Sequence, residues 1–222
     1  MRFKLLLLSF FFIGLFILFS YTVAKEMWQQ VDFDTMVKLQ DRIIGRFDGL
    51  TTLKIDQIFS YFSLWGSAEI TVGICLVMVF ISLIRRKWSA ILGWSMIVPA
   101  TLLEVFGKLM VFHPGPPRFF HRSLLPTSLP SFYVHTDFSY PSGHMTRTVF
   151  VVTILVILLI FSSKNIAPRF VALLLLLGFV FSMGITRVYL GEHWLSDVLG
   201  GGILGLAFGL LGSVLILRVK KS

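Results

Sequence analysis

Six long apolar stretches dominate the sequence, and their length constrains the fold more than any other feature. They cover residues 5–24, 66–84, 88–107, 145–163, 169–188 and 194–217. An α-helix rises about 1.5 Å per residue, so about 20 apolar residues cross the bilayer core. Composition agrees, because 56% of the 222 residues are hydrophobic, 14% are charged, and the mean hydropathy is +0.85. The sequence predicts an all-α, six-transmembrane-helix bundle that forms a single domain over residues 1–222.

Basic residues in the short connections indicate how the chain is oriented in the membrane. These connections contain no Asp or Glu, and they carry Arg2, Lys4, Arg85, Arg86, Lys87, Lys164, Arg169, Arg218, Lys220 and Lys221. The positive-inside rule therefore predicts a multi-pass protein of the cell membrane with both termini in the cytoplasm. About half of the basic residues belong to this pattern, so the net charge of +9 argues for topology and against nucleic-acid binding.

The N-terminal region, residues 1–65, precedes a core bundle that we expect over residues 66–222. Its first apolar stretch has a weak alternative as a cleaved signal peptide ending at Thr22-Val23-Ala24, although it is longer than an ordinary signal-peptide core. Apolar residues in the segment 25–65 recur at helical spacing between charged ones. They predict an extracytoplasmic helix that lies on the membrane surface or packs on the bundle. The segment 109–140 holds five prolines and predicts an irregular loop. The single cysteine, Cys75, excludes an intramolecular disulfide.

Five polar residues from distant segments should meet at one face of the membrane. Lys108 and Arg187 lie at the ends of the third and fifth stretches, and His144 lies at the start of the fourth. His193 precedes the sixth stretch, and Asp197 lies one turn into it. A lone Lys or Arg near the end of a membrane helix often only extends its charged group to the membrane surface and has no further function. Five such groups at one face of an apolar bundle favour an outward-facing active site.

The spacing of these residues suggests phosphoryl transfer. His193 and Asp197 are four residues apart, so they should share a helix face. The carboxylate could then hold one imidazole nitrogen and leave the other as a nucleophile. Ser142 and Gly143 begin a helix, where free backbone N–H groups favour an anion. Lys108 and Arg187 would add cationic donors for phosphate oxygens, and phosphoryl transfer depends mainly on such positioning and charge stabilisation.

Three motifs in this order resemble those of the type 2 phosphatidic acid phosphatase superfamily of membrane lipid phosphatases. The family patterns are KxxxxxxRP, PSGH and SRxxxxxHxxxD. The second is intact as Pro141 to His144, and the third runs from Thr186 to Asp197 with Thr in place of Ser. The first runs from Lys108 to Pro116, with Gly115 where the family has Arg. The resemblance extends from about residue 60 to the end of the chain.

The resemblance implies a role for each matched residue. His193 attacks phosphorus and becomes a phosphohistidine, Asp197 orients it, and His144 protonates the leaving oxygen. The implied phosphate-binding residues are Lys108, Ser142, Gly143 and Arg187. The resemblance implies a reaction without a cofactor or a metal. The implied substrate is a lipid phosphate in the bilayer. Candidate substrates are undecaprenyl pyrophosphate, phosphatidylglycerol phosphate and phosphatidic acid.

Because Gly115 stands where the family has Arg, the predicted phosphate site lacks one cation. Another basic residue could supply that charge. Arg147 follows His144 by three residues, and helical side chains lean toward the N-terminus of their helix, so Arg147 should point outward. Arg118, in the Pro-rich loop, is the second candidate, and His113 and Arg122 are weaker ones. Glu104, four residues before Lys108, could pair with it.

Three other functions remain compatible with the sequence. His144, His193 and Asp197 could form a two-His-one-carboxylate metal site, although hard cations prefer more carboxylates and no neighbouring Lys or Arg. The same phosphohistidine could pass its phosphoryl group to a second lipid. The glycine at position 115 could also mark a non-catalytic lipid-binding or transport protein.

Overall fold

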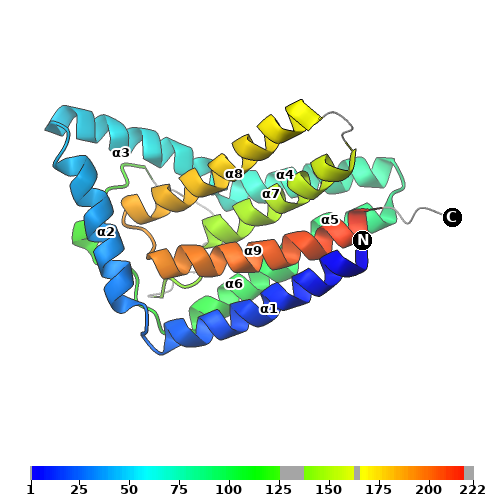
Figure 1. Ribbon diagram of the computed structural model, residues 1–222, viewed down its shortest axis with the longest axis horizontal. Helices are drawn as coiled ribbons and strands as arrows, with labels where there is room; N and C mark the ends of the chain where they lie inside the picture. Colours follow the sequence, from blue (N-terminus) through cyan, green and yellow to red (C-terminus); the bar gives the residue numbers. More distant parts are fainter. Residues whose placement is uncertain (1, 126–137, 163–165, 218–222) are drawn as a thin grey trace.

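The computed structural model describes residues 2–125, 138–162 and 166–217, and every described helix belongs to one bundle and its cap (Figure 1). The α-helices are α1 (Arg2–Ala24), α2 (Gln29–Ile44), α3 (Gly49–Ser63), α4 (Ala68–Ile84), α5 (Trp88–Ser95), α6 (Ile97–Met110), α7 (Gly143–Ser162), α8 (Ile166–Tyr189) and α9 (Leu195–Ile216). Two short 3₁₀ turns, η1 (Leu64–Gly66) and η2 (Arg118–Phe120), complete the set. Six segments of the described chain are long and apolar enough to span a bilayer, which confirms the predicted fold class.

Two boundaries differ from the prediction. The segment 25–65 forms two helices, α2 and α3, and α3 runs through η1 into α4, so the second apolar span covers Gly49–Ile84. The side chain of Asp48 accepts a hydrogen bond from Thr51 N at 3.0 Å and caps the start of α3. The third span breaks between α5 and α6, because Pro99 has no N–H to donate to Ser95.

The glycines of α9 bring it into close contact with α7. A Cβ atom added to Gly201 would lie 2.3 Å from Ser142 O, and one added to Gly205 would lie 2.3 Å from Thr146 O. Gly209 continues the four-residue repeat against α7. Small residues at this spacing allow two membrane helices to approach backbone to backbone. This contact sets the start of α7, with its PSGH motif, beside the start of α9.

Helices α1 and α5 pack on the other sides of α9. Ser9 Oγ of α1 donates to Ala207 O at 2.8 Å, and Ser20 Oγ and Tyr140 Oη share a hydrogen bond of 2.8 Å. The fully buried Trp94 of α5 belongs to the main apolar cluster, together with Phe150 of α7. Helix α9 is thus held from several sides, and the residues at its start have a rigid support.

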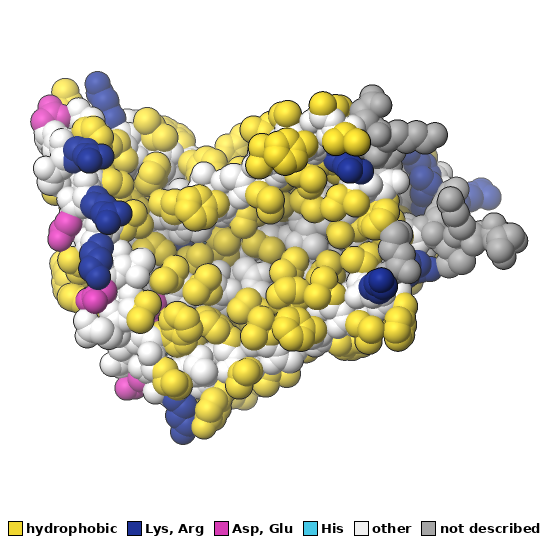
Figure 2. All heavy atoms as spheres, in the orientation of Figure 1, with side chains coloured by type: hydrophobic (Ala, Val, Ile, Leu, Met, Phe, Trp, Pro, Cys, Tyr) yellow, Lys and Arg dark blue, Asp and Glu magenta, His cyan; other side chains and the backbone are white. Residues whose placement is uncertain are grey.

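The two ends of the bundle differ. Helix α2 lies across one end, and the start of α1, the end of α9 and the α4–α5 connection lie at the other (Figure 1). In Figure 2, apolar side chains cover the helical body, whereas Lys, Arg, Asp and Glu gather over α2. Of the predicted topology signals, Lys164, Arg218, Lys220 and Lys221 lie outside the described residues, as does the part of the Pro-rich loop over 126–137.

Candidate active site

The candidate site lies at the α2 end of the bundle, where the starts of α7 and α9 meet the ends of α6 and α8. Ser142 N donates to Asp197 O at 3.0 Å, which joins the PSGH segment directly to the first turn of α9. The peptide bond between Tyr140 and Pro141 is cis. His144, in the first turn of α7, is buried, as are Lys108, Arg187 and His193. The structure therefore brings the predicted residues of all three motifs to one end of the bundle.

His193 and Asp197 form the predicted pair. His193 Nδ1 lies 3.3 Å from Asp197 Oδ2, and the same oxygen accepts a hydrogen bond from Trp194 N at 3.0 Å. Trp194 is the residue that caps α9, so His193 lies in the link before the helix, as predicted. The two residues therefore do not share a helix face, and the expectation from their four-residue spacing is wrong on this point. The N–H groups at the start of α9 support the carboxylate. Asp197 is thus fixed, and its Oδ2 fixes the orientation of the imidazole.

The surroundings of His193 favour its neutral form. Burial lowers the pKa of His193 well below its usual value of 6.5, and the positive charges of Arg187 and Lys108 lower it further. A neutral imidazole with a proton on Nδ1 carries a lone pair on Nε2. The pair can therefore present a nucleophilic nitrogen at neutral pH.

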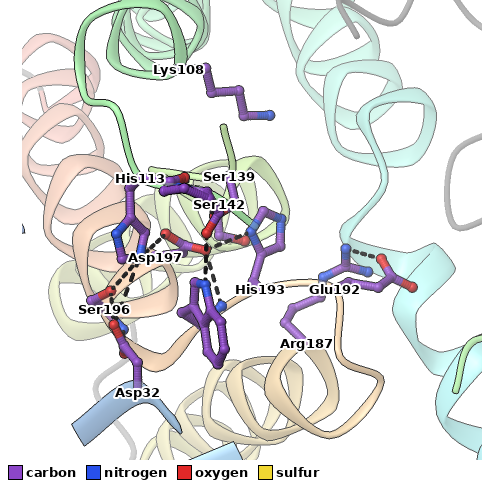
Figure 3. A network of polar contacts seen from close by, with 12 residues as sticks. Asp32, Lys108, His113, Ser139, Ser142, Arg187, Glu192, His193, Ser196 and Asp197 are labelled. Atoms are coloured by element: carbon purple, nitrogen blue, oxygen red, sulfur yellow. Dashed lines mark hydrogen bonds and ion pairs between the residues drawn. The ribbon is translucent and has the colours of Figure 1, made fainter. Parts of the chain in front are cut away.

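Carboxylates and a hydroxyl hold the two motif cations. Arg187 donates to Ser63 Oγ at 2.5 Å and forms an ion pair with Glu192. Lys108 Nζ lies 3.1 Å from Glu104 Oε1, one turn earlier on α6. Figure 3 shows Arg187 beside Glu192 on one side of His193, with Lys108 extending from α6. Protein groups therefore fix the positions of both cations.

Arg147 reaches toward the start of α7 and meets Glu104 there. Its Nη1 lies 2.7 Å from Glu104 Oε2, and both side chains are buried. A Cβ atom added to Gly143 would lie 2.2 Å from Glu104 Oε1 and 2.8 Å from Arg147 Nη1. Gly143 therefore makes room for this ion pair beside the first turn of α7. The outward lean predicted for Arg147 is present, and a phosphate contact by Arg147 stays a prediction.

Several buried polar atoms of the site have no hydrogen-bond partner among the described residues. They include Ser142 Oγ, Arg147 Nε and Arg187 Nε. Each of these atoms can donate a hydrogen bond, and burying a donor without an acceptor is costly. All three belong to residues that the sequence predicts to bind phosphate, and they are donors of the kind that bind phosphate oxygens.

The other candidates for the missing cation lie elsewhere. Arg118 is exposed in η2, and its phosphate role stays a prediction. Arg122 forms a two-pronged ion pair with Asp56 of α3, with hydrogen bonds of 3.0 and 2.7 Å. His113 lies behind Asp197, with its Nε2 3.7 Å from Asp197 Oδ1.

Sequence reasoning missed a second polar cluster on that side of Asp197. Ser196 N and Oγ both donate to the carboxylate of Asp32 on α2, at 2.8 and 2.7 Å, and Ser196 Oγ lies 3.3 Å from His113 Nε2. Burial raises the pKa of the Asp32 carboxyl, hydrogen bonds from Ser196 oppose this shift, and the charge of Asp197 adds to it. Ser63 and Glu192, which hold Arg187, were missed as well. No spacing rule links these residues, although Glu192 stands next to a motif residue.

The metal-site alternative gains no support from this geometry. Within residues 2–125, 138–162 and 166–217, no three His, Cys, Asp or Glu side chains are arranged to hold a metal ion. His193 instead contacts Asp197 directly, and two cations flank the pair.

Two solved structures share this fold. One is a transmembrane PAP2-type phosphatidylglycerolphosphate phosphatase from Bacillus subtilis, with a TM-score of 0.65 and 18% identity, covering 89% of this chain and 92% of that one. The other is Aquifex aeolicus LpxE, with a TM-score of 0.55 and 19% identity, covering 82% of this chain and 94% of that one. At these identities the likeness concerns the fold alone.

Sequence comparison places the motifs in a known family. Phosphatidylglycerophosphatase B of Bacillus subtilis (strain 168) is 35% identical over 72 residues, which make up 32% of this chain and 36% of that relative. The chain thus matches about a third of the length of this curated relative. The sequence profile of the PAP2 superfamily matches residues 88–221, more than half of the chain and all three motifs. By this match, the chain belongs to the PAP2 superfamily.

Proposed function

We propose that this protein is a membrane lipid phosphatase that hydrolyses a phosphomonoester or pyrophosphate of a lipid. The observation that carries the proposal is the buried His193–Asp197 pair, which Arg187 and Lys108 flank at one end of a membrane bundle. A neutral imidazole beside two cations suits attack on a phosphate and stabilises the charge of its oxygens. Membership in the PAP2 superfamily, whose relatives include phosphatases, supports the same activity.

The first step transfers the phosphoryl group to the enzyme. The lone pair of His193 Nε2 attacks phosphorus, and the bond between phosphorus and the lipid oxygen breaks. His144 gives a proton to that oxygen, so the lipid leaves as an alcohol or as a lipid monophosphate. Asp197 stabilises the positive charge that develops on the imidazole. The product is a phosphohistidine at residue 193.

The second step returns the enzyme to its starting state. His144, now unprotonated, accepts a proton from a water molecule as the water oxygen attacks phosphorus. The N–P bond breaks, inorganic phosphate leaves, and His193 regains its neutral form. Throughout both steps, Ser142, Arg187 and Lys108 hold the phosphate oxygens, and Arg147 supplies the cation that Gly115 lacks.

The site is proposed to face the outside of the cell, with both termini in the cytoplasm. Arg2, Lys4 and the run Arg85 to Lys87 belong to elements at the bundle end opposite the site (Figure 1). Basic residues favour the cytoplasmic side. The end that carries α2 and His193 would then lie at the outer headgroup layer, which contains the phosphate groups of the lipids.

Phosphatidylglycerol phosphate is the first substrate to test, because the curated relative is a phosphatidylglycerophosphatase. Undecaprenyl pyrophosphate and phosphatidic acid share the required terminal phosphate on a lipid. The test is release of inorganic phosphate from these three lipids by the purified protein in detergent, with and without EDTA. We expect release that EDTA does not affect and that His193→Ala abolishes. Loss of activity in EDTA would favour a metal hydrolase, and transfer of phosphate to an added lipid alcohol would indicate a phosphotransferase.

A further inference from the structure

The catalytic carboxylate Asp197 has a different neighbour on each side. Its Oδ2 lies 3.3 Å from His193 Nδ1, and its Oδ1 lies 3.7 Å from His113 Nε2. His113 is 5% exposed and Asp197 is fully buried. Figure 3 shows the side chains of Asp32, Ser196, His113, Asp197 and His193 as one continuous row. The carboxylate thus lies between two imidazoles, and the family motifs specify a histidine at only one of these positions, since His113 stands at an open position of the first motif.

Helix α2 holds the second imidazole in place. Asp32 Oδ2 lies 3.7 Å from His113 Nε2 and accepts a hydrogen bond from Ser196 Oγ at 2.7 Å. Ser196 Oγ also lies 3.3 Å from the same imidazole nitrogen. A proton on His113 Nε2 therefore faces two carboxylates and a hydroxyl, and every one of these groups is buried.

The backbone around His113 is attached to both neighbouring motifs. Ser139 N, just before the PSGH segment, donates to His113 O at 3.0 Å. Trp194 Nε1, next to the proposed nucleophile, donates to Pro114 O at 2.8 Å. The position of His113 is therefore tied to the same residues that build the catalytic pair.

We propose that His113 and Asp32 are positioning residues for the proposed reaction, which hold Asp197 so that its Oδ2 faces His193 Nδ1. A buried carboxylate with two oxygens can turn unless both are engaged. His113 Nε2 is the ion-pair neighbour of Oδ1, at 3.7 Å, and this oxygen accepts no hydrogen bond from the described residues. Asp32 and Ser196 in turn fix His113. The expected loss of kcat rests on the proposed phosphohistidine mechanism. The expected change in the orientation of Asp197 does not. This positioning also gives α2 a role: this cap helix completes the active site.

Kinetics provide the first test. His113→Gln and Asp32→Asn should each lower kcat by about 10- to 100-fold, which is the loss seen when the groups that orient metal-binding histidines are removed. Vanadate affinity should stay unchanged, because neither residue is proposed to touch phosphate. The double variant should lose little more than either single one, since both act through Asp197. A weakened vanadate affinity with an unchanged kcat would overturn the proposal.

Gln40 provides a matched control on the same helix. It is buried like Asp32 and holds α2 to the bundle through hydrogen bonds of 2.8 Å to Phe120 O and Tyr189 O, without touching Asp197. Gln40→Ala should lower thermal stability and leave kcat unchanged. If Gln40→Ala reduced kcat as much as Asp32→Asn, the effect would come from the packing of α2 and the positioning role would be wrong.

Chemical rescue tests His113 more directly. A surface pocket of about 400 Å³, lined by Asp32, His113, Gly115 and Trp194 among others, opens beside the imidazole. Free imidazole is small enough to enter such a pocket. We expect imidazole to restore part of the kcat of His113→Ala and to leave Gln40→Ala unaffected. Absence of rescue, together with an unchanged kcat in His113→Gln, would contradict the proposal.

The tautomer of His193 is a readout that does not depend on turnover. In the intact protein with ¹⁵N-labelled histidine, we expect NMR to show the proton of His193 on Nδ1. In His113→Gln that preference should weaken, because Asp197 Oδ1 loses its imidazole neighbour and the carboxylate is held through Oδ2 alone. An unchanged tautomer in His113→Gln would refute the positioning role. Failure of the proposed function would appear separately, as a wild-type protein with the Nδ1 tautomer but without a phosphohistidine.

Discussion

Arg147 Nη1 lies 2.7 Å from Glu104 Oε2, so a residue expected at the phosphate has a carboxylate partner within the protein. The other oxygen of Glu104 lies 3.1 Å from Lys108 Nζ. One buried carboxylate therefore holds two cations beside the first turn of α7. The relationship divides the role of Arg147 into two parts that experiments can separate, namely neutralising Glu104 and binding phosphate.

Removing Arg147 should weaken phosphate binding. We expect Arg147→Ala to lower vanadate affinity and kcat/KM by a factor on the order of 10 to 150, because one charge-assisted contact contributes about 1.5–3 kcal/mol. It should also lower thermal stability, because truncating one partner of a buried ion pair leaves the other charge poorly compensated. Vanadate inhibition and thermal unfolding in detergent measure the two effects.

The double variant Glu104→Gln with Arg147→Gln is the control. It removes the Arg147–Glu104 pair as a whole but also takes the carboxylate from Lys108, so thermal stability should recover in part, while the loss of vanadate affinity should remain. Recovery of both properties would mean that Arg147 serves only to neutralise Glu104. In the Arg147→Ala background, Gly115→Arg should regain part of the affinity, since a Cβ atom at position 115 meets nothing closer than Ser139 Cβ at 3.6 Å.

The role of His144 as an acid should depend on the leaving group. His144→Ala should reduce turnover strongly for an alkyl phosphate, whose leaving oxygen needs a proton. The loss should be smaller for p-nitrophenyl phosphate, whose leaving group is stable as an anion. The measurement is kcat for both substrates with the wild type and the variant. Equal losses for the two substrates would argue against proton donation by His144.

The pH dependence of activity should reflect the lowered pKa of His193. Burial, Arg187 and Lys108 all disfavour the protonated imidazole, so His193 should stay neutral and nucleophilic at pH values below 6.5. Protonation of His193 should therefore reduce activity only at pH values below the usual histidine pKa of 6.5. A ¹⁵N NMR titration, assigned with His193→Gln, measures this directly. Arg187→Gln should raise the pKa of His193 part of the way back toward 6.5. A wild-type His193 that titrates at or above 6.5 would contradict the proposed neutral nucleophile.

The proposed orientation can be tested with single cysteines. After removal of the buried Cys75, a cysteine in place of the exposed Phe119 should react with an impermeant thiol reagent in intact cells. A cysteine in place of Arg86, in the α4–α5 connection, should react only after the cells are opened. The reverse pattern would place the active site in the cytoplasm.

The sequence predicts the fold class, and it predicts that the motif residues meet at one end of the bundle, because both depend on local features. Apolar length alone identifies membrane helices, and fixed spacing places His193 near Asp197. The glycine repeat of α9, at Gly201, Gly205 and Gly209, was readable as a helix-packing signal and explains why the second and third motifs meet.

The partners of the motif residues were harder to predict, because they come from elements that approach only in the folded chain. Asp32 reaches Ser196 from a cap helix 164 positions away. Ser63 reaches Arg187 because α3 continues through η1 into the second span, which hydropathy alone does not show. The lean of Arg147 follows from helix geometry, but its partner Glu104 depends on how α6 packs against α7.

The most direct test of the central proposal is the chemical trapping of the phosphoryl group on His193. Wild-type protein is mixed with ³²P-labelled lipid phosphate, quenched in alkali, which preserves phosphohistidine, and digested for peptide mapping. We predict acid-labile label on the peptide that carries His193, no label in His193→Ala, and reduced label in Asp197→Asn. Phosphate release by the wild type without any such label, or full activity in His193→Ala, would contradict the phosphohistidine mechanism.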